Sequence, residues 1–467
     1  MKANQNKINK VEILFFLLSL LSSILISYGL YFFVWVAFAP LIYLALTKST
    51  RKAGILSAIY GLIVSIFFFT WVHDPNLETR NKLYIIIIIV FAAYFILFST
   101  AIAYFSKKLK SANMFLLPPV IWLVLMLLYS LLPIHIYWMD FAIFQPMMAP
   151  LIWYVGSFGI TFLIILFNSV VASYFIKKDK NLAYLIFLLF FLIVACFLYS
   201  NYTDFQYKEN KIKVALLQGN FPYSWEWRQE HAFDTLLETY LNMTSQALKE
   251  KPDLIIWPEY SIPKDVTKNE SILKLLKKTS IDSKSTLILG SLSYINGEKY
   301  KDQALVFYPD GTFEAYDSVD PYFMETWIVK GSSVNPFHLN KNKFGITICN
   351  EENTQSIIRK YAVNDIQFIV SISNNQFFGR GRYIISQFTR LRAAENAKYL
   401  VRAANDGITQ IVDPFGKVIG SLEPKKQNIL IGNIYVNSYK TFYTKYGNVL
   451  VYLLMILSVI LVLKRGR

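Results

Sequence analysis

Long apolar segments fill the first 200 residues of the chain and return near its C-terminus. A helix that spans a membrane needs about 20 mostly apolar residues. We find seven such segments before residue 201 and an eighth near the end, at roughly 12–28, 29–47, 54–72, 83–106, 114–132, 150–176, 182–200 and 446–463. The pattern predicts a membrane protein with an eight-helix transmembrane bundle. The first segment lacks a small-residue cleavage site, so we expect an anchor rather than a removed signal peptide.

The pattern changes between the seventh and eighth apolar segments, where short β-branched runs alternate with amphipathic stretches. We expect strands at 213–217, 254–257, 287–289, 304–308, 312–316, 345–349, 368–371 and 400–403, and a last hairpin at 415–416. We expect helices at 231–248, 271–278, 354–362 and 386–396. Strands that alternate with helices indicate a layered α/β domain. The predicted organisation is a membrane part at 1–200, a domain outside the bilayer at 201–445, and a last span with its tail at 446–467.

Composition supports a membrane protein and excludes several other classes. Of the 467 residues, 54% are hydrophobic and 17% are charged, whereas a soluble globular chain is about a quarter charged. Two cysteines exclude a disulfide framework. The four histidines show no metal-ligand spacing, and there is no glycine-rich phosphate loop, so we expect no metal and no other cofactor.

The net charge of +16 suits either nucleic acid or a membrane, and the placement of the charges favours the membrane. Basic residues cluster beside the apolar segments, which is the signal of the positive-inside rule. The clusters are Lys2, Lys7 and Lys10; Lys48, Arg51 and Lys52; Lys107, Lys108 and Lys110; Lys177, Lys178 and Lys180; and Lys464, Arg465 and Arg467. They predict that both termini are cytoplasmic and that residues 201–445 lie on the outer face of the cytoplasmic membrane, with no nucleic-acid partner.

Two strand ends in the polar region carry reactive side chains. Glu259 follows the apolar run that ends at Trp257 and Pro258, and Cys349 ends the run that begins at Gly345. Sites in α/β folds form at such strand ends, although a glutamate there also suits a solvated loop and a cysteine also suits an apolar core. A helix follows Cys349, so we expect its thiol to have a lowered pKa and to be able to attack a carbonyl carbon.

A third stretch places Ser373, Asn374 and Asn375 after a strand, followed by 390–396 and 402–408. Asparagine and glycine in such loops also suit tight turns. Together the motifs are more specific. Trp257-Pro-Glu259, Cys349-Asn-Glu351, Ser373-Asn-Asn375 and the two later stretches occur in an order that resembles the carbon–nitrogen hydrolase (nitrilase) superfamily. With apolar spans on both sides, the chain resembles the apolipoprotein N-acyltransferases of bacteria over nearly its whole length.

The resemblance implies a nitrilase-like α-β-β-α sandwich and a two-step acyl transfer without a cofactor. In that family, a cysteine takes a fatty acyl chain from a phospholipid, usually phosphatidylethanolamine, as a thioester. The α-amino group of a diacylglyceryl-cysteine on a lipoprotein then attacks this thioester. The resemblance makes Cys349 the nucleophile and Glu259 the general base. It gives supporting roles to four further residues, namely Glu325, Glu351, Trp227 and Asn374.

The chain departs from the family at one member of the usual Glu–Lys–Cys triad. Alignment on Tyr316 places Ser318 where the family has lysine, and serine cannot supply the positive charge that stabilises an oxyanion. Asp302 stands where the family has asparagine. Lys301 and Lys330 are the nearby candidates for a replacement cation. Three hypotheses follow: an active acyltransferase, an amidase or acyltransferase with altered substrates, or a non-catalytic relative that binds lipid or lipoprotein.

Overall fold

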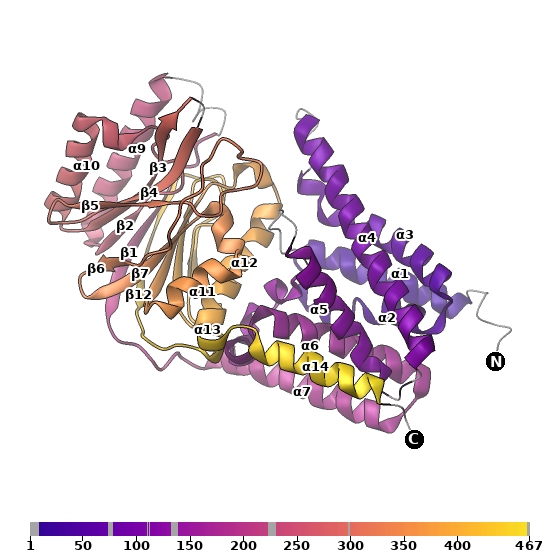
Figure 1. Cartoon of the computed structure of the whole chain (residues 1–467). Coiled ribbons are helices and arrows are strands. Elements are labelled where there is room, and N and C mark those ends of the chain that lie inside the picture. Colours follow the sequence, from indigo (N-terminus) through magenta and orange to yellow (C-terminus); the bar gives the residue numbers. More distant parts are fainter. Residues whose placement is uncertain are drawn as a thin grey trace. The chain divides into compact units, whose positions relative to one another are not determined.

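The computed structural model describes residues 9–72, 78–109, 111, 113–131, 139–222, 230–297 and 299–464, which form two compact units. The first unit holds the apolar helices at both ends of the chain, and the second holds the strands and the helices that cover them (Figure 1). Each unit is described by itself.

The first unit is entirely helical. Its helices are α1 (Lys10–Ser27), α2 (Ala39–Thr47), α3 (Thr50–Phe68), α4 (Glu78–Leu109), α5 (Leu117–Tyr129), α6 (Ala149–Lys177), α7 (Lys180–Tyr202) and α14 (Val449–Leu463). Five helical segments are long and apolar enough to cross a membrane, at 10–27, 50–68, 81–109, 146–177 and 180–202. The segments 31–47, 114–129 and 449–463 are shorter apolar helices. The chain is therefore a membrane protein with five long apolar helices, and helix length does not establish the predicted count of eight spans.

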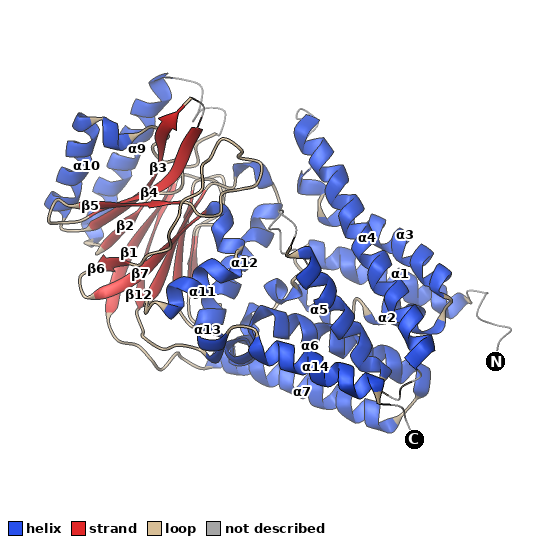
Figure 2. Ribbon diagram, in the orientation of Figure 1, coloured by secondary structure: helices blue, strands red, loops and turns tan. Residues whose placement is uncertain are grey.

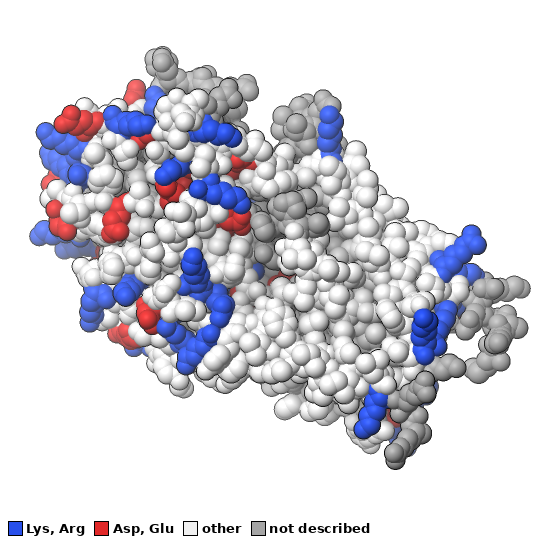
Figure 3. All heavy atoms as spheres, in the orientation of Figure 1, with Lys and Arg blue, Asp and Glu red and all other residues white. Residues whose placement is uncertain are grey.

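The surface of this unit suits a lipid environment. The face drawn in Figure 3 carries almost no charged side chain between its ends. On α7, Tyr184 and Phe187 are each 70% exposed and Leu188 is 61% exposed. Exposure of such apolar side chains is unfavourable in water but not in lipid. Basic side chains gather at the end of the bundle where α1 begins and α14 ends (Figures 1 and 3).

Two predicted spans are not continuous helices. The segment 29–47 consists of a 3-10 turn at Tyr31–Trp35 followed by the short helix α2. Helix α6 bends at Gly156, where φ is 62° and ψ is −171°. A left-handed φ is open to glycine at little cost, and periodicity of apolar residues gives no sign of such a break.

Asn168 of α6 stabilises the first of these breaks. Its Nδ2 donates to the carbonyl oxygens of Val34 (3.0 Å) and Ile164 (2.8 Å). Its Oδ1 accepts from the backbone N–H groups of Phe38 (2.9 Å) and Ala39 (2.8 Å), where α2 begins. The first N–H groups of a helix have no partner within it, and away from water they need one from elsewhere.

The second unit contains two six-stranded sheets. The strands are β1 (Lys211–Gln218), β2 (Leu254–Ile256), β3 (Thr286–Asn296), β4 (Lys299–Phe307), β5 (Phe313–Asp317), β6 (Phe337–Leu339), β7 (Asn342–Ile348), β8 (Phe368–Ser373), β9 (Tyr399–Ala404), β10 (Gln410–Val412), β11 (Val418–Ser421) and β12 (Asn428–Tyr435). The sheet orders are β12-β1-β2-β3-β4-β5 and β11-β10-β9-β8-β7-β6. In each sheet three central strands are parallel, namely β1, β2 and β3 in one and β7, β8 and β9 in the other.

Helices cover the outer faces of both sheets (Figure 2). They are α9 (Glu230–Ala247) and α10 (Glu270–Ser283) on one side, and α11 (Gln355–Val363) and α12 (Gly381–Asn396) on the other, followed by α13 (Phe442–Tyr446). Alternate residues of β1 pack on opposite faces of the sheet. Val214 and Leu216 pack in the core shared by the two sheets, whereas Ala215 and Leu217 pack under α9 and α10. This period of two produces the four-layer α-β-β-α sandwich that the family resemblance implied.

Most of the predicted strands and helices of this unit are present, with shifted ends. β3 runs to Asn296 rather than 289, and α12 begins at Gly381 rather than 386. Strands β6 and β12 were not predicted. β12 pairs with β1 along its whole length, from Lys211 opposite Tyr435 to Gln218 opposite Asn428. This pairing joins residues more than 200 positions apart, which local sequence patterns do not reveal.

We predict that Asn168→Ala destabilises the bundle by about 2–4 kcal/mol, because two helix N–H groups and two carbonyl oxygens each lose one hydrogen bond. Thermal unfolding of the chain in detergent measures this loss. Ser169→Ala is the matched control, since the buried Ser169 hydroxyl has no hydrogen-bond partner among the described residues. Equal melting temperatures for the two variants would contradict the role given to Asn168.

Candidate active site

Glu259 lies at the carboxyl end of β2, inside the protein. The strand ends at Ile256, and the indole of Trp257 donates to Thr244 Oγ1 at 3.0 Å. Glu259 is only 1% exposed. Its backbone passes so close to Gly290 of β3 that a Cβ there would lie 2.6 Å from the Glu259 Cα atom. Gly290 therefore lets the glutamate backbone pack directly against the neighbouring strand.

Cys349 lies at the carboxyl end of β7, in the other sheet. It begins a 3-10 turn at Cys349–Asn353 and has a φ of 47°, in the left-handed region that residues with a side chain rarely occupy. Tyr260, directly after Glu259, has a φ of 54°. Strained backbone of this kind clusters at functional sites. Glu259 and Cys349 lie close enough that each affects the pKa of the other, so the fold brings the two residues together.

Asn374 contributes through its main chain. Its backbone N–H donates to Glu259 Oε2 at 2.6 Å, directly after β8. Its side-chain oxygen instead accepts from the backbone of Gln376 at 3.4 Å. Asn374, a predicted supporting residue, is therefore in contact with Glu259. The contact uses its backbone N–H, a group that every residue except proline has.

Glu351 connects the turn that holds Cys349 to the segment after β5. Its Oε2 accepts from the backbone of Ile348 at 2.8 Å. Its Oε1 accepts from the Tyr316 hydroxyl at 2.8 Å, and from the backbone of Val319 at 2.6 Å. Burial raises the pKa of Glu351 to about 7. With these bonds the carboxyl group fixes the backbone on both sides of Cys349.

Ser318 does not take the place of the missing lysine. It is buried, and its hydroxyl donates to Glu351 Oε1 at 3.2 Å. Neither candidate cation is in the site. Lys301 Nζ lies 2.6 Å from Asp317 Oδ2, and Lys330 Nζ lies 3.6 Å from Asp320 Oδ1 with its side chain 62% exposed. The hypothesis of a replacement cation at these two lysines is therefore not supported by the geometry.

Two carboxyl groups among the described residues, those of Asp302 and Glu325, lie near Glu259. Burial raises the pKa of Glu259 well above its usual range, and the negative charges of Asp302 and Glu325 raise it further. Burial likewise raises the pKa of Glu325 to about 7. The hydroxyl of Tyr260 donates to Glu325 Oε1 at 3.2 Å. A carboxyl group with a raised pKa is a better base near neutral pH, because it binds a proton more strongly.

The expectation of a lowered thiol pKa is wrong. Burial raises the pKa of Cys349, and the nearby negative charges of Glu259 and Glu325 raise it further. The turn that follows the cysteine is a short 3-10 turn rather than a long helix, so it supplies little compensating dipole. The thiol is therefore protonated at rest, and a base has to remove its proton during attack on a carbonyl carbon.

A buried ion pair lies next to the site, and the sequence analysis assigned it no role. Arg402 Nε and Nη2 donate to the two oxygens of Glu352 at 2.7 and 2.8 Å, with both side chains fully buried. Arg402 also donates to the Ser373 hydroxyl at 3.0 Å and to the side-chain oxygen of Asn375. The pair thus connects the turn after Cys349 to the loop that supplies the Asn374 N–H group. Arg402 begins the quoted stretch 402–408 and Glu352 directly follows the quoted Cys349-Asn-Glu351, but only the fold shows that they are paired.

The predictions on Trp227 and on metal ions concern different parts of the chain. Trp227 lies outside the described residues. Among the described residues, no cluster of three or more His, Cys, Asp or Glu side chains could hold a metal ion.

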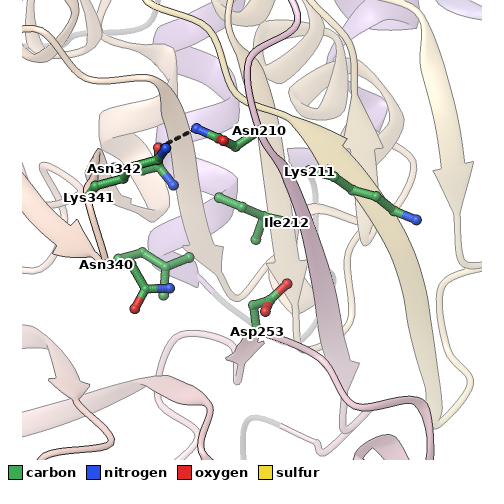
Figure 4. Close-up of a pocket in the computed structure, with 8 residues that line it drawn as sticks. Asn210, Lys211, Ile212, Asp253, Asn340, Lys341 and Asn342 are labelled. Atoms are coloured by element: carbon green, nitrogen blue, oxygen red, sulfur yellow. Dashed lines mark hydrogen bonds between the residues drawn. The ribbon is translucent and has the colours of Figure 1, made fainter.

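A pocket of about 350 Å³ lies elsewhere in the sandwich (Figure 4). Residues at the amino ends of β1 and β2 and at the turn between β6 and β7 line it, including Lys211, Asp253 and Asn340. Asp253 precedes β2, whereas Glu259 follows it, so the pocket is at the opposite end of that strand from Glu259 and Cys349. Figure 4 shows the Asn210 amide bonded to Asn342 and no cysteine among the lining residues.

Two family models match the chain in succession. Residues 18–170 match the apolipoprotein N-acyltransferase N-terminal domain, and residues 213–443 match the carbon–nitrogen hydrolase family. An apolipoprotein N-acyltransferase of Geobacter metallireducens is 26% identical over 93% of this chain and 92% of its own length. One from Haemophilus ducreyi is 29% identical over 65% of this chain and 66% of its own length. Nit3 of Saccharomyces cerevisiae, a nitrilase-superfamily structure, aligns with 50% of this chain and 93% of its own at 17% identity, with a TM-score of 0.42.

Two sheets between helical layers, with a buried glutamate beside a cysteine at the strand ends, define a domain of the carbon–nitrogen hydrolase class. That domain is joined to an apolar helical unit that matches a second, more specific model. The chain belongs to the apolipoprotein N-acyltransferase family.

We predict that Arg402→Met destabilises the hydrolase unit by about 3–5 kcal/mol, because it leaves the buried Glu352 charge without a partner. Thermal unfolding of the whole chain in detergent is the measurement. Lys208→Met is the control. Lys208 pairs with Asp204 at 3.3 Å in an exposed ion pair, which contributes about 0–1 kcal/mol. A loss in Arg402→Met no larger than in Lys208→Met would contradict the prediction.

A second substitution tests the close packing beneath Glu259. Gly290→Ala places a Cβ 2.6 Å from the Tyr260 nitrogen and the Glu259 Cα atom, so the glutamate must move. We expect the reaction of Cys349 with iodoacetamide to slow by about 10²-fold, since the base no longer reaches the thiol. Gly420→Ala is the control, as its new Cβ would meet only the flexible Leu430 side chain at 3.3 Å. Unchanged reactivity in Gly290→Ala would show that Glu259 does not act on the thiol.

Proposed function

We propose that the protein is an N-acyltransferase that acylates the α-amino group of the diacylglyceryl-cysteine of lipoproteins, through a thioester on Cys349. The single observation that carries this proposal is that the fold places the buried Glu259 carboxyl beside the Cys349 thiol. Family membership supports the substrate class, because the relatives in Haemophilus ducreyi and Geobacter metallireducens are named apolipoprotein N-acyltransferases. The apolar helical unit supports a lipid donor, for which we propose phosphatidylethanolamine.

The first half-reaction moves an acyl chain to the enzyme. Glu259 takes the proton from Cys349 Sγ as the sulfur attacks the ester carbonyl carbon of the phospholipid. The bond from that carbon to the glycerol oxygen then breaks. Glu259 returns the proton to the departing oxygen, which leaves as the hydroxyl of a lysophospholipid. The raised pKa of Glu259 suits both transfers, because the group binds the proton firmly and still lies beside the atoms that exchange it.

The second half-reaction releases the enzyme. The neutral α-amino nitrogen of the lipoprotein attacks the thioester carbon while Glu259 takes a proton from that nitrogen. The carbon–sulfur bond breaks, and the proton passes to Sγ, so that an amide and the free thiol result. In this scheme Glu325, Glu351 and Asn374 hold Glu259 and the Cys349 turn in place, which agrees with their bonds to Tyr260, the Ile348 backbone and Glu259 respectively.

The proposed topology extends this function to the membrane. We propose eight spans, a membrane part at 1–200, a hydrolase domain at 201–445 on the outer face of the bacterial cytoplasmic membrane, and a last span with a cytoplasmic tail at 446–467. The basic clusters of the sequence support this orientation. So does the position of the start of α1 and the end of α14 at one end of the bundle (Figure 1). Phospholipid and lipoprotein substrates both lie in that membrane.

Incubation of the purified chain with phosphatidylethanolamine, followed by intact-mass spectrometry, tests the first half-reaction. We expect a mass gain of one acyl chain that hydroxylamine removes, because thioesters are cleaved by it. Cys349→Ala should abolish the gain. Cys196→Ala is the matched control and should leave it unchanged, since Cys196 lies in α7 and is not bonded to Glu259.

The absence of an adduct with several phospholipids would overturn the proposal. The chain would then be better described as a relative that binds lipid or lipoprotein without reacting. Retention of the adduct in Cys349→Ala would contradict the assignment of the nucleophile alone.

A further inference from the structure

Asn405, directly after β9, is hydrogen bonded to the loop that follows β1. Its Nδ2 donates to the carbonyl oxygen of Phe221 at 2.8 Å, and its Oδ1 accepts from the N–H of the same residue at 2.9 Å. Its backbone oxygen accepts from the N–H of Asn220 at 2.9 Å. Asn405 is only 1% exposed. Because β9 and β1 belong to different sheets, these three bonds from one residue join the two sheets.

The same residue contacts the loop that supports Glu259. The Asn405 N–H donates to the carbonyl oxygen of Ser373 at 3.0 Å, and its Nδ2 lies 3.5 Å from Asn374 Oδ1. Asn374 follows β8, and its N–H donates to Glu259 Oε2 at 2.6 Å, after β2 of the other sheet. Since β1 pairs with β2 and β8 pairs with β9, the two connections between the sheets are neighbours. Asn405 makes one of them and contacts the other.

The turn at 405–407 does not need asparagine or glycine for its backbone conformation. Neither Asn405 nor Gly407 has the left-handed φ for which turns select these residues. Gly407 is needed for close packing instead, because a Cβ there would lie 2.6 Å from Asn375 Oδ1. The contacts of this turn with the loop after β8 therefore explain the two residues better than the tight-turn interpretation of the sequence.

Asn437 makes a similar connection at the opposite end of the strands. It follows β12, and its Nδ2 donates to the carbonyl oxygen of Ala397, before β9, at 3.0 Å. Its Oδ1 accepts from the N–H of Tyr439 at 3.1 Å, and the residue is fully buried. The end of β12 pairs with the beginning of β1. Asn437 and Asn405 thus join the same two sheets through a buried amide, but only Asn405 lies at the end where Glu259 is found.

We propose that Asn405 is a positioning residue for the reaction of Cys349. It fixes the separation of the two sheets at the strand ends, so that the Glu259 carboxyl stays within reach of the thiol. The inference rests on the proposed function, in which Glu259 is the base. Asn405 exchanges no proton in that scheme. Its effect on the rate therefore has to pass through the position of Glu259.

A double-mutant cycle tests this dependence in the whole chain. Cys196→Ala leaves Cys349 as the only thiol, and intact mass measures its alkylation by iodoacetamide. We expect Asn405→Ala to slow alkylation about tenfold, because a displaced base takes the proton less readily. In the Glu259→Gln background the same substitution should change the rate by less than about twofold, since no base is left to displace.

Asn437→Ala is the matched control. Like Asn405→Ala, it removes a buried amide that joins the sheets, so both variants should melt at a lower temperature than the wild type. Only Asn405→Ala should slow alkylation, measured well below both melting temperatures. If Asn405→Ala does not fold, Asn405→Ser is the second variant. Its hydroxyl can bond to water, but it is too short to bond both backbone groups of Phe221, so the same dependence on Glu259 is expected.

Three results would overturn the inference. They are an unchanged alkylation rate in Asn405→Ala, an equal slowing with and without Glu259, and an equal slowing in Asn437→Ala, which would indicate lost stability rather than lost position. Iodoacetamide needs no phospholipid site. The absence of a phospholipid thioester, together with the expected dependence on Glu259, would therefore refute the proposed function alone.

Discussion

The Glu259 carboxyl group is held in the protein interior, where a charge without compensation costs several kcal/mol. The surrounding structure provides what that burial requires. Gly290 lets the backbone that follows β2 pack against β3, the Asn374 N–H donates at 2.6 Å, and the Cys349 thiol lies close by at the end of a strand of the opposite sheet. Strand ends from the two sheets must therefore lie close together. The fully buried Arg402–Glu352 pair stabilises the loops that follow these strand ends.

The absence of a lysine changes how this site handles charge. Ser318 stands where the resemblance places the lysine of the triad, and its hydroxyl donates to Glu351. Burial and neighbouring carboxylates raise the pKa values of Glu259, Asp302 and Cys349 together. A thiol that is protonated at rest is unreactive until a base acts on it, and this limits side reactions of the partly exposed cysteine.

In the helical unit too, buried polar groups need hydrogen-bond partners within the protein. Lipid offers no hydrogen bonds, so each break in a helix must be satisfied from within the protein. Asn168 uses one donor and its acceptor oxygen for the break before α2, and the capping box of Asn9 and Glu12 begins α1 in the same way. Glu12 is also paired with Lys48 at 2.5 Å, so one of the basic residues that indicated topology has a structural partner as well.

The sequence by itself determined the apolar segments, the alternation of strands and helices, and the positions of Glu259 and Cys349 at strand ends, because these depend on local periodicity and on motifs. Tertiary structure decided which groups meet. Asp302 lies near Glu259, Ser318 donates to Glu351, and Asn374 acts through its backbone only once separate strands are paired. It also reversed the expected shift of the Cys349 pKa, since desolvation and neighbouring charges depend on residues that are far apart in the chain.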